Sequence, residues 1–265
     1  MNILFSLVIN LAMAVSPYSD LIDLPKEMPV ALKSVVERDF DLINECEFKN
    51  TSPLFGEMFK LNENKNFDPS WFRQRITKVR ADSGVGSDAE FGRGHRLKLV
   101  PKLCGSETKA DTLTLGPFYF AGTQPERIAT LIHEARHADG CSHTKFPENF
   151  VCSDNLPVAS KEICDDTSDG QCDDTYKGAY GAQMIFLVNF ARNCVGDRQE
   201  IEKMKFRAFN MFRKILNVND RKKLAEDLFS VEEIERFKKD LSSPMPLFGQ
   251  IESKTVGKVQ ICAPK

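Results

Sequence analysis

Three of the four histidines in this chain of 265 residues fall within eleven positions, in the stretch HEARHADGCSH at 133–143. His133 and His137 are four residues apart, so on a helix their rings project from one face, about one turn apart. Imidazole nitrogen is a common ligand of Zn²⁺, which is usually held by four ligands in a tetrahedral arrangement. The spacing therefore predicts that His133 and His137 bind the same metal ion.

Other residues of this stretch could complete a reactive centre. Glu134 follows the first histidine and could take a proton from a water on the metal, rather than bind the metal itself. A left-handed Gly140 would end the helix and turn the chain back, so that His143 delivers a third nitrogen. Three protein ligands leave the open position that catalysis needs. We expect Zn²⁺ as cofactor, with His133, His137 and His143 as ligands and Glu134 as the general base of a hydrolysis.

Residues from about 124 to 139 are expected to form the helix that carries the first two histidines. Thr123 and Glu126 have the spacing of a capping box, and apolar residues follow at intervals of three and four. Two strands are predicted before this helix, over 95–100 and over 112–120. A proline within the second run indicates an edge strand.

Together with Gly140, the histidines and the glutamate form the complete pattern HExxHxxGxxH. This pattern resembles the long zinc signature of the metzincins, the zincin clan that includes astacins, serralysins and matrixins. The resemblance covers these eleven residues and their strand and helix context, and it implies a zincin-like metallopeptidase acting on a protein or peptide substrate. It also implies that the substrate lies along an edge strand, for which 112–120 is the candidate, and that Met184 or Met245 forms a turn beneath the metal.

A second resemblance concerns the third ligand. The segments FYFAG and RIATLIHEARH, followed by DDTYKGAYG at 173–181, are similar to the pattern of the aspzincins, the deuterolysin-like metallopeptidases. This resemblance implies that Asp173 or Asp174 binds the metal in place of His143, and that Tyr180 stabilises the oxyanion. Both assignments of the third ligand stay open on the sequence.

The N-terminal segment and the cysteines predict export. The first residues are uncharged and mostly apolar, and small residues follow, which is typical of a signal peptide over 1–16 that is cleaved from a secreted or periplasmic protein. All eight cysteines lie after it, and this even number predicts four disulfides in an oxidising compartment. Short loops favour pairing Cys164 with Cys172 and Cys141 with Cys152.

The remaining sequence predicts a single α+β domain over 17–265. The cysteine-rich stretch 141–177 has no apolar period and is expected to be a long loop stapled by disulfides, whereas 178–242 has helical spacing. We expect a mainly helical, zincin-like domain with a small mixed or antiparallel sheet. The net charge of −2, from 36 basic and 38 acidic residues, argues against nucleic acid as a partner. After cleavage of the leader no membrane span is expected, and the oligomeric state is not indicated.

Two other functions fit the same residues. A metal-activated water could hydrolyse an amide in cell-wall peptide, which would make the protein a zinc amidase. Alternatively, a fourth protein ligand such as Asp139 or Asp173 would close the site, and zinc would then only stabilise a non-catalytic secreted binding protein. Cys46 or Cys104 could also cap the metal as a thiolate in an inactive precursor, although disulfide bonding of both is favoured.

Overall fold

The computed structural model describes residues 16–84, 89–91, 104–105, 108–151, 154–164, 170–242 and 261. The expected signal peptide, apart from Ser16, and the expected strand over 95–100 lie outside these residues, as do Cys152, Met245 and Cys262. About half of the described residues are helical and there is one small sheet, so the predicted α+β class is confirmed.

The helices are α1 (Val30–Glu45), α2 (Pro53–Met58), α3 (Ser70–Arg73), α4 (Pro117–Ala121), α5 (Gln124–His137), α6 (Lys161–Cys164), α7 (Ala179–Cys194), α8 (Arg198–Asn210), the 3-10 helix η1 (Met211–Lys214), α9 (Val218–Leu228) and α10 (Val231–Ser242).

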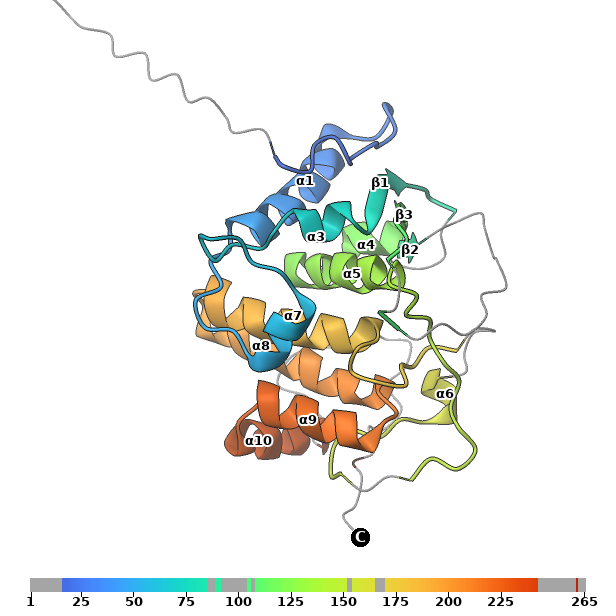
Figure 1. The fold of residues 1–265 in the computed structure, drawn as a ribbon, viewed down its shortest axis with the longest axis vertical. Helices are drawn as coiled ribbons and strands as arrows, with labels where there is room; N and C mark the ends of the chain where they lie inside the picture. Colours follow the sequence, from blue (N-terminus) through green and yellow to red (C-terminus); the bar gives the residue numbers. More distant parts are fainter. Residues whose placement is uncertain are drawn as a thin grey trace, which may run out of the picture.

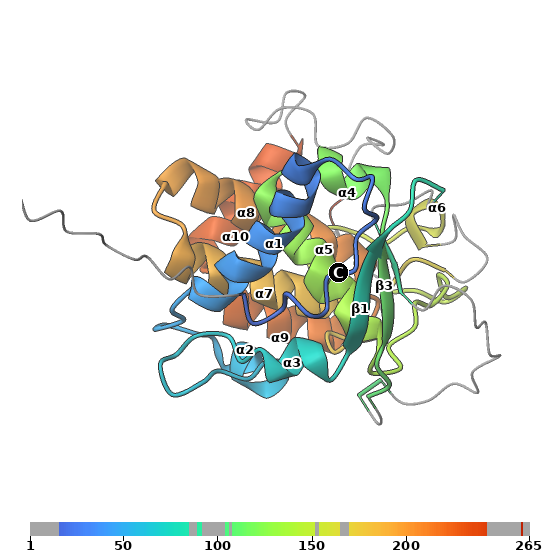
Figure 2. The same cartoon turned by 90° about the horizontal axis from the view of Figure 1, so that it is seen from above.

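The long helices are stacked in layers around α7 (Figures 1 and 2). Helix α1 packs on α5, α5 packs on α7, and α7 packs in turn on α8 and α9. Most residues of α7 are buried, which is expected of a helix that is covered on several sides. Helix α7 is therefore a firm support for the residues that contact its first turns.

Aromatic side chains fix α7 against the N-terminal segments. Phe59 and Phe67 pack against Trp71 of α3 and Phe186 of α7, with ring centroids 5.3–5.7 Å apart. Each buried side chain of this size stabilises the fold by about 1.5–3 kcal/mol relative to an exposed one. The core on this side of α7 is therefore well packed.

The sheet contains β1 (Ile76–Ala81), β2 (Ala89–Phe91) and β3 (Asp111–Leu115), in the order β1-β3-β2. Because β1 is parallel and β2 antiparallel to β3, the sheet is mixed. The predicted strand over 112–120 is too long, because Pro117 begins α4 instead of continuing the strand. A proline cannot donate to a strand ladder, but it fits the first turn of a helix. The expectation of an edge strand is also wrong, since β3 is the middle one of the described strands.

The boundaries of α5 follow from local chemistry, as predicted. The backbone N–H of Thr123 donates to the Glu126 carboxylate at 2.5 Å, which is one half of the capping box. Past the last turn, Gly140 has a φ of +75°, a conformation that favours glycine. The helix therefore begins at Gln124, ends at His137, and is followed by a turn that redirects the chain.

Three disulfides join described residues. Cys46–Cys194 links the end of α1 to the end of α7, and Cys104–Cys141 links Cys104 to the turn after α5. Cys164–Cys172 lies within the cysteine-rich segment. The pairing of Cys164 with Cys172 is confirmed, whereas the pairing of Cys141 with Cys152 is wrong because Cys141 bonds to Cys104. Cys46 and Cys104 are therefore not available as thiolate caps on a metal.

The cysteine-rich segment is held against the C-terminal helices by Arg221 of α9. The guanidinium of Arg221 is fully buried. It pairs with Asp154 and donates to the carbonyl oxygens of Pro157 at 2.6 Å and Ile215 at 3.0 Å. Removing one partner of a buried ion pair typically costs 3–5 kcal/mol, so this contact is a strong anchor.

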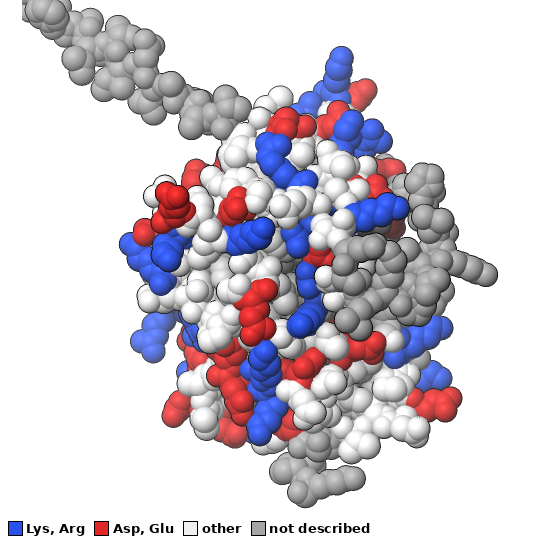
Figure 3. All heavy atoms as spheres, viewed as in Figure 1, with Lys and Arg blue, Asp and Glu red and all other residues white. Residues whose placement is uncertain are grey.

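Over the described residues of the face in Figure 3, basic and acidic side chains are interspersed. Within the described ranges, no helix is both long enough and apolar enough to cross a membrane. The disulfides fit an extracellular protein.

Candidate metal centre

Helix α5 presents His133 and His137 on one face, as their spacing predicts. Their ring centroids are 5.1 Å apart. His133 is buried against α7, with 8% of its surface exposed, and His137 is partly exposed near the end of α5. The regular geometry of the helix is sufficient to bring these two rings together.

His143 reaches the same point from the cysteine-rich segment. Its ring centroid lies 5.1 Å from that of His133 and 4.7 Å from that of His137. One potential ligand nitrogen from each histidine lies within 4.8 Å of the others, and the Nε2 atoms of His133 and His143 are 3.2 Å apart. Two ligands at about 2.0–2.1 Å from a tetrahedral zinc would be roughly 3.4 Å apart. The cluster therefore has the dimensions needed to hold one metal ion.

The second nitrogen of each histidine faces an oxygen acceptor. The Nδ1 atom of His133 is 3.1 Å from Gln183 Oε1, that of His137 is 2.5 Å from the carbonyl oxygen of Cys141, and that of His143 is 3.0 Å from Asp173 Oδ1. An oxygen acceptor at Nδ1 favours the tautomer that carries its proton there. The lone pair of Nε2 is then available to a metal.

The environment also keeps two of the rings neutral. Burial lowers the pKa of His133 well below its usual value, and the neighbouring imidazoles lower it further. Burial and the proximity of His143 lower the pKa of His137 to about 4. Because neutral imidazole is the form that binds metals, both residues are prepared for coordination near neutral pH.

Asp173 lies on the side of the His143 ring that faces away from His133. Asp173 is buried, with 2% of its surface exposed, and its Oδ1 atom contacts Nδ1 of His143. Its Oδ2 atom accepts hydrogen bonds from the backbone N–H groups of Tyr180 at 2.6 Å and Gly181 at 3.4 Å. Asp173 is therefore in contact with a histidine of the cluster without being one of its members. Asp174, the other aspartate considered as a ligand, is exposed.

Tyr180 is brought to the cluster by the first turn of α7. Its ring stacks on His143 with centroids 5.0 Å apart and contacts the edge of His133 at 4.5 Å. The Nζ atom of Lys214 lies 5.3 Å from the centroid of the same ring. Glu134 is partly exposed on α5, next to His133 in the chain.

Asp139 is engaged elsewhere. Its carboxylate pairs with Arg136 and with Arg75, whose Nε is 3.0 Å from Oδ2, and it accepts a hydrogen bond of 2.6 Å from Thr108. Arg136 in turn donates to the carbonyl oxygen of Lys177 at 2.9 Å. This network anchors the end of α5 and does not include a histidine.

Neither Gln183 nor the hydrogen bond between Asp173 and His143 was expected from the sequence. Gln183 is three residues after Tyr180 on α7, and this spacing could have placed both side chains on one face. No local pattern indicates that the same face meets His133, which is fifty residues earlier in the chain.

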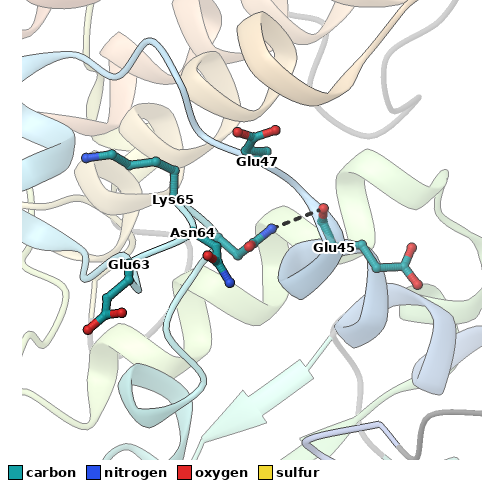
Figure 4. A pocket seen from close by; sticks show the side chains of 6 residues that line it. Glu45, Glu47, Glu63, Asn64 and Lys65 are labelled. Carbon is teal, nitrogen blue, oxygen red and sulfur yellow. Dashed lines mark hydrogen bonds between the residues drawn. The ribbon is translucent and has the colours of Figure 1, made fainter.

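A separate surface hollow of about 420 Å³ lies elsewhere on the molecule (Figure 4). It is open and is lined by the acidic residues Glu45, Glu47 and Glu63, with Asn64, Lys65 and Asn66. The amide of Asn66 donates to the carbonyl oxygen of Glu45 at 3.3 Å. None of the three clustered histidines contributes to its lining.

No protein-family model matches the chain, and comparisons with curated proteins and with solved structures likewise gave no match. The geometry of the histidine cluster is therefore the basis for assigning a function.

Proposed function

We propose that the protein is a secreted zinc metalloendopeptidase. In this proposal His133, His137 and His143 hold the metal, Glu134 is the general base, and the domain is zincin-like. The observation that carries it is the arrangement of the three imidazoles. Each Nδ1 faces an oxygen acceptor, and one potential ligand nitrogen of each ring lies within 4.8 Å of the others.

The donor set fits zinc. Imidazole suits several transition metals, zinc among them, and the HExxHxxGxxH pattern favours zinc within this group. A zinc ion at this position would supply Lewis-acid chemistry, making water acidic enough to attack a carbonyl near neutral pH. The carbonyl oxygen of Cys141 faces Nδ1 of His137 and orients that ring for this purpose.

Glu134 and Tyr180 are the residues that would act on the substrate. The Glu134 carboxylate accepts the proton of the attacking water and passes it to the leaving amine, a role that contributes about 10²- to 10⁴-fold to the rate. Tyr180 contacts both His133 and His143, so its phenol is close enough to be the candidate stabiliser of the oxyanion.

A site closed by a fourth protein ligand receives less support. Among the described residues, the cluster of potential ligands consists of three histidines. The two aspartates considered as a fourth ligand have other partners, since Asp139 pairs with arginines and Asp173 contacts His143 and α7. A metal held by three histidines keeps a position for a reacting molecule, which favours catalysis over a purely structural role.

The test is zinc content and proteolysis of the mature chain, wild type against Glu134→Gln. We expect the variant to retain one zinc per chain and to lose about 10²- to 10⁴-fold of its turnover on denatured protein. Glu226→Gln, at an exposed position on α9, is the matched control and should behave as wild type. A wild type without zinc, or full activity of Glu134→Gln, would refute the proposal. Activity on cell-wall peptide but not on protein would identify an amidase instead.

A further inference from the structure

The Asp173 carboxylate joins two parts of the site that are distant in sequence. One oxygen contacts His143, and the other accepts from two N–H groups in the first turn of α7, those of Tyr180 and Gly181. The N-cap residue of α7 is Gly178, which has no side chain that could accept these groups. Asp173 therefore supplies the capping oxygen that Ser, Thr, Asp or Asn usually provides from the N-cap itself.

The main chain of Asp173 is fixed independently of its side chain. Its N–H donates to the carbonyl oxygen of Lys214 at 2.7 Å, and its carbonyl oxygen accepts from Leu216 at 2.9 Å. The preceding residue, Cys172, exchanges backbone hydrogen bonds of 2.6 and 3.2 Å with Thr144, the neighbour of His143, and is bonded to Cys164. The Asp173 main chain therefore has partners of its own, which do not depend on the contact between its carboxylate and His143.

Two glycines leave the room that this contact requires. A Cβ atom at Gly178 would overlap the Asp173 carboxylate, and one at Gly181 would overlap the main chain of Tyr176. The backbone of Gly178 is extended, with φ −66° and ψ −176°, so other residues could adopt it. The reason for glycine at 178 is therefore the space occupied by the carboxylate.

The same helix also holds His133, through Gln183. Two histidines from separate segments thus have their Nδ1 atoms fixed by way of α7, one directly and the other through Asp173. Their Nε2 atoms are 3.2 Å apart as a result.

We propose that Asp173 is a positioning residue of the metal centre and not a metal ligand. It holds His143 in the tautomer with a proton on Nδ1 and orients the ring so that Nε2 faces the metal. This inference rests on the part of the proposed function that has the histidines bind a metal. Loss of such an outer partner typically weakens metal binding by about 10- to 100-fold.

The first experiment compares the affinity for Zn²⁺ of wild type, Asp173→Asn and Asp174→Asn, by competition with a chromophoric chelator near neutral pH. An asparagine has one acceptor oxygen, so it cannot accept from both His143 and α7. We expect Asp173→Asn to bind zinc about 10- to 100-fold more weakly, and Asp174→Asn to bind as wild type. Unchanged affinity of Asp173→Asn would overturn the inference. A loss as large as that of His143→Ala would also overturn it, by identifying Asp173 as a ligand.

A second pair of variants removes no polar group. Gly178→Ala pushes on the Asp173 carboxylate, whereas a Cβ at Gly196 meets no atom within 4 Å. We expect Gly178→Ala to weaken zinc binding by about 10-fold, in the lower part of the range for outer partners, and Gly196→Ala to leave it unchanged. Equal affinities of the two variants would count against the inference.

Nitrogen NMR of the metal-free wild type requires no substitution. We expect His143 to carry its proton on Nδ1, and a proton on Nε2 would overturn the role of Asp173 even if zinc binds. A wild type that binds no zinc would overturn the proposed function, so the two failures are distinguishable.

Discussion

His133 and His137 come from a regular helix, whereas His143 comes from a segment with little regular structure. The helical repeat places the α5 pair on one face, and Gln183 and the carbonyl oxygen of Cys141 contact the two rings. His143 depends on the bridge between Thr144 and Cys172, on a disulfide and on the Asp173 carboxylate. The histidine cluster therefore combines side chains placed by local geometry with one placed by long-range contacts, and each kind should respond to different perturbations.

Removing single disulfides should distinguish most clearly between the α5 histidines, which depend on local geometry, and His143, which depends on long-range contacts. By chain entropy, loss of Cys46–Cys194, with a separation of 148 residues, would destabilise the fold by roughly 5 kcal/mol, and loss of Cys164–Cys172, with a separation of 8, by roughly 2.5 kcal/mol. We expect the second change to weaken zinc binding, because it loosens Cys172 beside Asp173. The first should leave the zinc affinity of the folded protein unchanged. Paired serine variants, with denaturant unfolding and zinc titration, test this, and the reverse order would contradict the comparison.

Replacing a histidine should abolish tight zinc binding from either side. If about 10–16 kcal/mol of binding free energy is shared among the three histidines, each is worth about 3–5 kcal/mol, or roughly 10³-fold in affinity. We expect His133→Ala and His143→Ala to lose similar affinity. His133→Ala should also destabilise the metal-free protein more, since His133 is buried between α5 and α7. Thermal unfolding in a chelator measures the second effect, and equal midpoints for the two variants would refute it.

The pH dependence of the metal-free protein should report on the α5 pair. Between pH 6.5 and about 4 the unfolded chain takes up a proton at His137 that the folded protein does not, because the folded pKa is about 4. The contribution of His137 to the free energy of unfolding is therefore fully present above pH 6.5. It is lost as the pH is lowered through this window, which reduces the free energy of unfolding by up to about 3 kcal/mol. Urea unfolding at several pH values measures the slope. His137→Gln should flatten it, and an unchanged slope would contradict the assignment.

The smallest expected change in zinc affinity comes from replacing Gln183, which contacts His133. Gln183→Leu removes a neutral hydrogen bond, worth about 1 kcal/mol, from a histidine that the helix already places. We expect zinc affinity to fall by only about 5-fold, less than for Asp173→Asn. A larger loss for Gln183→Leu would mean that α5 relies on long-range contacts as much as the loop does.

Local chemistry made α5 predictable from the sequence. The pairing of Thr123 with Glu126, the apolar spacing and Gly140 each act within a few residues, and the predicted helix over 124–139 ends within two residues of the observed one. The i, i+4 placement of two histidines follows from the same local geometry. The pattern also predicted that His143 approaches the α5 histidines, but it did not predict the contacts with Asp173 and Cys172 that hold His143 and Thr144.

Contacts between distant segments could not be derived in this way. A proline such as Pro117 is compatible both with an edge strand and with the first turn of a helix. The local sequence could therefore not distinguish these two structures. Cys141 pairs across 37 residues with Cys104, since the entropy of closing a loop rises only slowly with its length. For Asp173, the sequence indicated a carboxylate near the site, and its contact with His143 Nδ1 became evident only in the three-dimensional structure.

The backbone pairing of Asp173 with the segment after η1 sets a lower limit on the size of a working fragment. A chain cut after α8 would keep all three histidines, Glu134 and α7, yet it would lack Ile215 and Arg221, which secure the Asp173 main chain and the cysteine-rich segment. A shorter fragment that keeps the histidine cluster in place should therefore retain the sequence through α9, although that helix contributes no residue to the cluster.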